Sequence, residues 1–206
     1  TIQSMESFMT GFLGVQKQCT SPNYIFNVAT QETNIGDMHA NFAACPILPE
    51  MLANFANDQE WKDKHAKYAD VIERVSKAFE IKSSVELWKL ADILTCRASR
   101  GVVPPTGVTQ EDVDAIDEIY VWEYEYTNRN HKYLTLSIGA FLARLVQEMD
   151  RVSVHNRGSI PFQLYSGHDT TIAPLVGTLG IDLTRETWPV YASNVHFQVL
   201  TDGSSK

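Results

Sequence analysis

Residues 162–179 combine a short apolar run, a turn of small residues and the start of a helix. The run Phe162-Gln163-Leu164-Tyr165 is typical of a buried strand, and residues 172–179 have the composition of a helix. Between them lies Ser166-Gly167-His168-Asp169-Thr170-Thr171. In a parallel sheet, such a turn brings side chains to the carboxyl edge of a strand, opposite a helix N-terminus that attracts anions. The pattern predicts an α/β fold with an anion site at this turn.

Two adjacent residues of the turn have side chains that can take part in catalysis. The imidazole of His168 can donate a hydrogen bond to a phosphate oxygen, and the carboxyl group of Asp169 can give a proton to a departing oxygen. The alternative is a structural role in which Asp169 or Thr170 caps the helix. For the dipeptide alone, the structural role is favoured.

The surrounding residues reverse that preference. The segment Tyr165-Ser166-Gly167-His168-Asp169-Thr170-Thr171 resembles, nearly letter for letter, the C-terminal active-site motif of the histidine acid phosphatases. Further segments similar to this family follow in the family's order: residues 1–13, Cys45-Pro46, the turn at 101–105 and Tyr191-Ala192-Ser193. The resemblance implies hydrolysis of phosphomonoesters through a phosphohistidine, without a metal or other cofactor. It assigns phosphate binding to His168 and proton donation to Asp169.

The resemblance also implies a fold. It predicts a three-layer α/β/α core, like that of phosphoglycerate mutase, with a helical cap inserted between core strands. Residues 1–45 and 146–206 would be parts of the core, and residues 46–145 would form the mostly helical cap. Within the core, residues 24–28 and 195–200 are expected to be further strands.

One motif of the family is missing. Its nucleophilic histidine belongs to an Arg-His-Gly motif on the first strand, and these 206 residues contain no such triplet. A second phosphate-binding arginine would stand immediately before Thr1. Without these groups there is no covalent intermediate and little to hold the phosphate oxygens. The chain is therefore expected to be the C-terminal part of an enzyme and to be inactive alone.

Several polar residues are candidates for substrate binding. Thr170 follows the catalytic pair directly, and Asp37 and His39 lie in a polar loop that is either a rim of the site or a solvated loop. The basic stretch 128–132 includes Arg129 and His131, which either steer a phosphate or belong to a solvated turn.

Helical periodicity dominates the middle of the chain. Apolar residues recur at helical spacing in 61–79, 85–94 and 138–149, and capping boxes are expected at Ser83 with Glu86 and at Thr109 with Asp112. The aromatic and acidic residues at 122–126 either form a binding platform, if extended, or continue the helix that begins near Thr109. The helix is the preferred interpretation.

Composition limits the partners. The net charge of −8 argues against a nucleic-acid backbone partner. The resemblance implies a small-molecule phosphomonoester as the substrate, and the question of a homodimer stays open. Cys19, Cys45 and Cys96 lack the spacing of a zinc site, and their pairing is open. The resemblance implies a secreted, lysosomal or membrane-associated location in the secretory pathway.

Two other functions compete with an enzyme of this family. A phosphatase-like binding or interaction module would keep the fold without the nucleophile, although such a module has no need of the proton donor Asp169. A metal-dependent hydrolase is poorly supported, because the six histidines show no ligand spacing.

Overall fold

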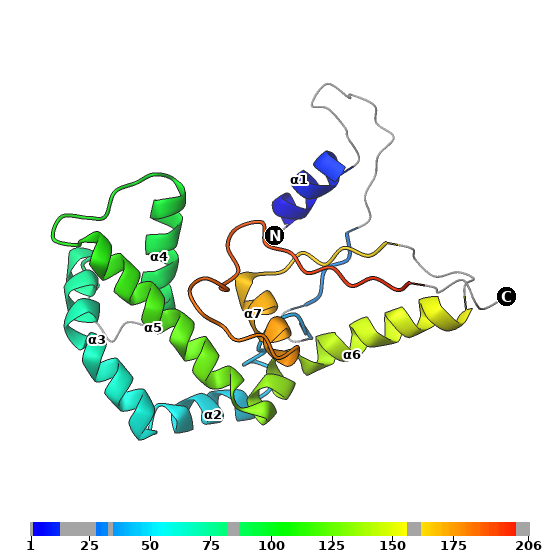
Figure 1. Ribbon diagram of the computed structural model, residues 1–206, viewed down its shortest axis with the longest axis horizontal. Coiled ribbons are helices and arrows are strands. Elements are labelled where there is room, and N and C mark those ends of the chain that lie inside the picture. Colours follow the sequence, from blue (N-terminus) through cyan, green and yellow to red (C-terminus); the bar gives the residue numbers. More distant parts are fainter. Residues whose placement is uncertain (1, 13–27, 33–34, 82–86, 156–161, 201–206) are drawn as a thin grey trace.

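The computed structural model describes residues 2–12, 28–32, 35–81, 87–155 and 162–200. Within these ranges the regular secondary structure is helical (Figure 1). The helices are α1 (Ile2–Phe12), α2 (Ile47–Phe55), α3 (Gln59–Ala78), α4 (Leu87–Ser99), α5 (Gln110–Asn128), α6 (His131–His155) and α7 (Asp169–Thr178).

The predicted α/β/α core is wrong for the described part of the chain, because those residues contain no strand. The segments 162–165 and 195–200, both expected to be strands, have no regular secondary structure. The expected strand at 24–28 lies outside the described residues except for Val28, which is also irregular. The physical reason is that a strand is stabilised by hydrogen bonds and side-chain pairs with a neighbouring strand. An apolar run can form one strand, but it does not supply the neighbouring strand.

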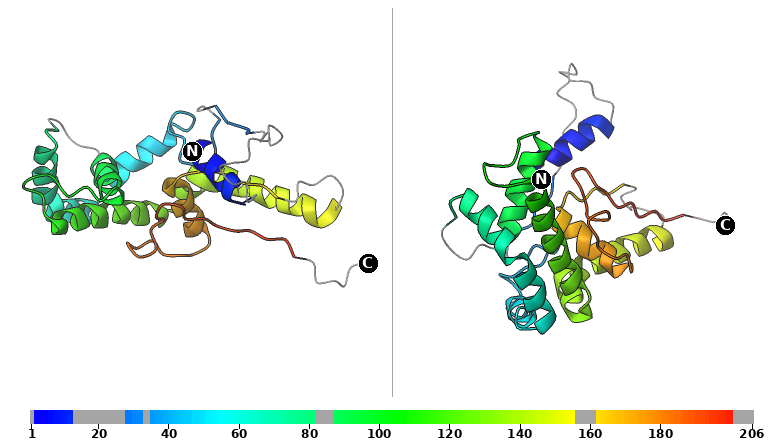
Figure 2. Two further views of the ribbon diagram at one scale, coloured as in Figure 1. Left: turned by 90° about the horizontal axis from the view of Figure 1, so that it is seen from above. Right: turned by 60° about the vertical axis from the view of Figure 1, so that its left-hand side comes forward.

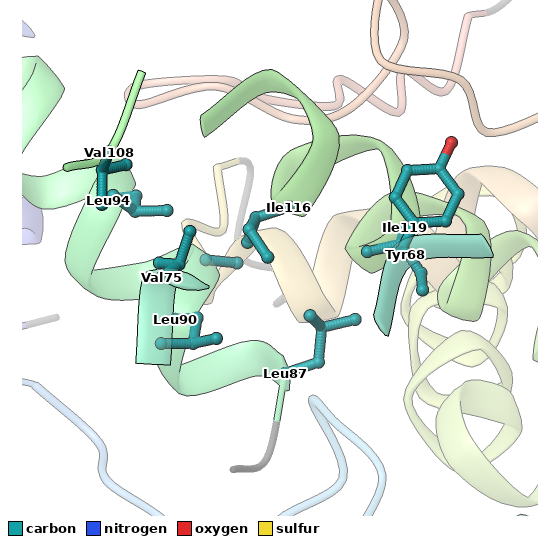
Figure 3. Close-up of a cluster of buried hydrophobic side chains, with 9 residues drawn as sticks. Tyr68, Val75, Leu87, Leu90, Leu94, Val108, Ile116 and Ile119 are labelled. Atoms are coloured by element: carbon teal, nitrogen blue, oxygen red, sulfur yellow. The ribbon is translucent and has the colours of Figure 1, made fainter. Parts of the chain in front are cut away.

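Helices α3, α4 and α5 form a bundle in the part of the molecule drawn at the left of Figure 1. Their facing sides share a core whose fully buried members include Val75, Leu90, Ile116 and Ile119. In Figure 3, Val75 of α3, Leu90 of α4 and Ile116 of α5 point toward one another. Apolar residues three and four apart produce this stripe, so burial of one face holds each helix in place.

The second half of the fold joins α6, α7 and the loop that precedes α2. Leu134, Ile138, Phe141 and Leu145 of α6 pack against Leu175 of α7. Met38 and Tyr165 cover the same cluster from the loop and from the segment that leads into α7. Both views of Figure 2 show α6 reaching away from the α3–α5 bundle, while α5 continues toward α7. Helix α5 therefore connects the bundle to the region that carries the predicted site.

Most helices expected from periodicity are confirmed. The helix from Thr109 continues through residues 122–126 as α5, and its Thr109–Asp112 capping box is present. The capping box expected at Ser83 and Glu86 lies outside the described residues. No helix in the described ranges is long and apolar enough to cross a membrane. The cap boundaries at 46 and 145 stay a prediction.

A charged contact fixes the start of α5 against α3. The backbone N–H of Thr109 donates to Asp112 Oδ2 at 2.9 Å, and the Thr109 hydroxyl accepts from the N–H of Asp112 at 3.2 Å. The guanidinium of Arg74 on α3 also donates to this carboxylate, with Nε 3.2 Å from Oδ2. These donors, led by Arg74, lower the pKa of Asp112 to about 2, although its burial acts in the opposite direction.

Replacing Ile116 with alanine should lower the free energy of unfolding by about 2–5 kcal/mol, because the site is closed on all sides and a cavity would remain. The matched control is Ile35→Ala, since the side chain of Ile35 is 64% exposed. Its effect should stay within about 0.5 kcal/mol. Urea denaturation of the full-length variants measures both. Equal losses would contradict the assignment of Ile116 to the core.

Asp112→Asn should remove a pH-dependent part of the stability. The folded pKa of about 2 lies below the ordinary value of 3.8, so the stabilisation is present above pH 3.8 and is lost as the pH falls toward 2. Denaturation across that range should therefore show a shallower acid loss in the variant. Glu111→Gln, an exposed change in the same helical turn, is the control and should keep the wild-type slope. An unchanged slope in Asp112→Asn would contradict the role of the Arg74 contact.

Candidate active site

The predicted motif forms the turn that leads into α7. His168 is the residue before the helix, with extended backbone angles of φ −128° and ψ 169°, and Asp169 is the first helical residue. The carbonyl oxygen of His168 accepts from the N–H groups of Thr171 and Ile172 at 3.0 and 3.1 Å. Its own N–H donates to Thr171 Oγ1 at 3.1 Å. These bonds fix the backbone of His168 relative to the helix axis.

Gly167 is required for this turn because of close packing. A Cβ atom at this position would lie 2.7 Å from Thr171 Oγ1 and 3.1 Å from Met38 Cε. The Thr171 hydroxyl is the group that accepts from the N–H of His168, so a larger residue would displace the contact that orients the histidine. The glycine thus serves the geometry of the motif.

The two predicted catalytic side chains lie side by side at the start of α7. His168 is exposed and Asp169 is half-buried. Asp169 Oδ1 accepts from the N–H of Thr170 at 2.8 Å, which leaves its second oxygen for another partner. The N-terminal end of α7 carries partial positive charge, so a bound anion is favoured at the same place.

A second histidine faces His168. The ring of His39 lies edge-on to it, with a distance of 6.4 Å between ring centroids and an interplanar angle of 88°. His39 was expected only as a rim residue in a polar loop, and the structure places it beside the motif. An anion bound by His168 would therefore meet two imidazole rings.

The loop that carries His39 is held by an ion pair. Arg144 on α6 donates through Nε and Nη2 to the two oxygens of Asp37 at 3.0 and 2.8 Å. Its guanidinium also lies over the rings of Phe141 and Tyr165, 5.2 and 5.1 Å from their centroids. Because an arginine fork bonds both carboxylate oxygens in one plane, it orients the loop as well as attracting it. Asp37 therefore acts as an anchor for the loop.

An aromatic cluster borders the site on the α5 side. Tyr120 and Tyr124 contact each other and both contact Trp188, with ring centroids 5.1 to 5.3 Å apart. Burial raises the pKa of Tyr124 to about 12, and the nearby charge of Asp169 adds to the increase. Burial also raises the pKa of Tyr120, with the same contribution from Asp169. Both hydroxyl groups are thus neutral, so they add no charge near Asp169.

The remaining predicted site residues are placed differently. Thr170 lies in the first turn of α7, directly after Asp169. Arg129 ends α5 and bonds the two oxygens of Glu125 at 2.7 Å each and Glu60 at 2.8 Å. His131 begins α6 and is exposed. In the part of the chain that the structure describes, no interaction joins Arg129 or His131 to the motif, so their role as substrate ligands stays a prediction.

Sequence reasoning missed Arg144, Tyr120 and Tyr124 as neighbours of the site. The two tyrosines are four residues apart, so their spacing showed that they share a face of the helix. What it did not show is that this face turns toward α7. No sequence pattern pointed to Arg144, because its partner Asp37 is 107 residues away. Among the described residues, no cluster of three or more histidine, cysteine or carboxylate side chains can hold a metal ion.

Three curated proteins are similar to the chain over most of its length. Counting factor 60 of Dictyostelium discoideum is 26% identical over 203 residues, covering 98% of this chain and 48% of that protein. A probable acid phosphatase of the same organism is 25% identical over 221 residues, covering 100% of this chain and 46% of that protein. Putative acid phosphatase 5 of Caenorhabditis elegans is 24% identical over 160 residues, covering 73% of this chain and 36% of that protein.

The chain thus spans about half the length of the first two curated relatives. No solved structure matches it significantly. A family model described as histidine phosphatase superfamily, branch 2, matches residues 1–206, and the resemblance seen in the turn at 165–171 is therefore confirmed over the whole chain. The chain belongs to branch 2 of the histidine phosphatase superfamily.

Proposed function

We propose that the full-length protein is an acid phosphatase that hydrolyses phosphomonoesters and that the turn at residues 166–171 is part of its active site. The observation that carries this proposal is the adjacency of an exposed imidazole, His168, and a half-buried carboxyl group, Asp169, at the N-terminal end of α7. Membership of the family and the names of the acid phosphatase relatives support the same reaction class.

His168 and Asp169 have different roles in this proposal. His168 donates a hydrogen bond to an oxygen of the phosphoryl group and stabilises the charge that develops there. Asp169 gives its proton to the ester oxygen as the phosphorus–oxygen bond breaks and the phosphoryl group passes to the nucleophilic histidine, so that the alcohol leaves neutral. The resulting carboxylate then accepts a proton from the water that attacks phosphorus, and the phosphorus–nitrogen bond breaks, which releases phosphate and restores the acid.

The phosphohistidine of the proposed mechanism needs a nucleophile from an Arg-His-Gly motif. The 206 residues contain no such triplet, so the proposal assigns only phosphate binding and proton transfer to this chain. A phosphorylated intermediate in the full-length protein that survives in base and is hydrolysed in acid, as a phosphohistidine is, is the signature of the complete mechanism.

Asp169→Asn in the full-length protein should slow the hydrolysis of alkyl phosphates far more than that of aryl phosphates. An alkoxide needs a proton in order to leave, whereas a nitrophenolate does not, so kcat/KM for an alkyl phosphate should fall by about 10²–10⁴-fold. Steady-state rates with a series of esters of rising leaving-group pKa measure the difference. Asp182→Asn, an exposed change in the loop after α7, is the control and should leave the series unchanged.

Two outcomes would contradict parts of the proposal. Equal losses for aryl and alkyl esters would remove Asp169 from the acid role. Phosphate binding without turnover of any ester, in the wild-type protein, would instead favour a phosphatase-like binding module.

Gly167→Ala should lower the rates for aryl and alkyl phosphates together, because it displaces Thr171 and misplaces His168. A misplacement of about 1 Å costs on the order of 10²-fold in rate. Gly139→Ala on α6 is the matched control, since a Cβ there would lie 3.4 Å from Thr135 Cγ2, an ordinary contact. Thermal unfolding of both variants separates a local effect from a loss of folding. Wild-type rates in Gly167→Ala would show that the turn does not orient a catalytic group.

A further inference from the structure

A small hollow of about 110 Å³ adjoins the motif, between α5, α6, α7 and the loop at 39–42. Tyr124 and Asn128 line it from α5, and Tyr133 and Ser137 line it from α6. Each of these pairs is four residues apart, so both helices turn one continuous face toward the space. The hollow is therefore built from the regular parts of the fold.

Two contacts place this hollow beside the reacting groups. Thr170, which follows the proposed acid Asp169 directly, is one wall. His39 is another, and its ring faces that of His168 at 6.4 Å between centroids. A phosphoryl group held at His168 would thus have the hollow within reach of its ester oxygen. The carbon atoms attached to that oxygen are the part of a substrate that would enter.

The lining determines which carbon groups fit. The rings of Phe42, Tyr124 and Tyr133 contribute most of its aromatic surface, together with Pro174. None of the described residues that line the hollow is a lysine, arginine, aspartate or glutamate. Burial raises the pKa of Tyr124 to about 12 and also raises that of Tyr133, so these hydroxyl groups stay neutral. A cationic leaving group would lose its hydration here without gaining a partner of opposite charge.

The volume of the hollow indicates how large a substrate group it can enclose. An engineered cavity of about 150 Å³ holds a benzene molecule, and sites for drug-sized ligands occupy about 300–1,000 Å³. A hollow of about 110 Å³ is smaller than either. Nucleosides and sugars would therefore extend beyond it, whereas a short branched alkyl group fits within it.

We propose that this hollow is the leaving-group pocket, and that the preferred substrates are phosphomonoesters of small uncharged alcohols. This inference rests on the proposed phosphatase function and adds the class of alcohol. Two polar groups in the wall can accept a hydrogen bond, so a single hydroxyl group on the substrate would still find a partner. Ser137 Oγ donates to the carbonyl of Leu134 at 3.0 Å and keeps its acceptor capacity. Pro174 lacks an N–H, which deprives the Thr170 carbonyl of its usual helical donor.

Primary alkyl phosphates test size and charge at nearly constant leaving-group basicity. With the full-length protein, kcat/KM for isobutyl phosphate should exceed that for cyclohexylmethyl phosphate by about tenfold or more, because the larger ring meets the walls. It should exceed by a similar factor that for the analogue in which one methyl group is replaced by an ammonium group, because no acidic side chain lines the hollow. Methyl phosphate, which barely enters the hollow, reports the chemical step alone.

Variants of the wall change the selectivity in opposite directions. Phe42→Ala should raise the relative rate for cyclohexylmethyl phosphate by about tenfold, and it should fold normally because the Phe42 side chain is 45% exposed. Phe8→Ala on α1 is the matched control, since its side chain is 44% exposed and lies outside the hollow. Ala40→Leu should lower the rate for isobutyl phosphate more than that for methyl phosphate, because it fills part of the hollow.

The outcomes separate the two proposals. Turnover with no preference for small neutral groups, or the same selectivity in Phe42→Ala and Phe8→Ala, would overturn the leaving-group pocket alone. No turnover of any ester, methyl and p-nitrophenyl phosphate included, would overturn the phosphatase function and the pocket with it.

Discussion

Burial of Ile116 and Ile119 on α5 is the contact on which both halves of the fold depend. Both side chains are fully buried between α3 and α4, while the other end of the same helix packs against α6 and α7. At that end Tyr124 reaches the neighbourhood of Asp169, and a Cβ on Gly177 of α7 would lie 3.1 Å from Asn128 Nδ2. Because a helix is stiff, the bundle core and the wall of the candidate site are positioned by one element.

Helix positions were predictable from the sequence, and the overall fold class was not. A helix satisfies its backbone hydrogen bonds internally, so local signals can locate it. For α5, the apolar residues at helical spacing and the Thr109–Asp112 capping box were sufficient. A strand needs a second segment in register. The run at 162–165 has a strand-like composition and yet no regular structure, since pairing depends on segments that its own residues do not specify.

The candidate site also has some features that were predictable from local sequence and others that were not. His168 and Asp169 were located because a local motif carried them, and their place at the start of α7 follows from residues within three positions. His39 was only a loop candidate, and its approach to His168 depends on an ion pair between Asp37 and Arg144. That pair joins residues 107 positions apart. Contacts between residues so far apart in the sequence arise from the packing of the folded chain, and a single sequence does not indicate them.

Charge gives a consistent account of the proposed choice of substrate. Arg74 and Arg144, like Arg129 at the end of α5, are bonded to carboxylates, so little of their charge is left to attract an anion. The attraction at the motif comes from His168 and the N-terminal end of α7, which act only at short range. At long range, the net charge of −8 repels anions, and the repulsion grows with each charge on the ligand. A monoester whose alcohol is uncharged meets the smallest barrier, and it is also the ester that suits a pocket wall without charged side chains.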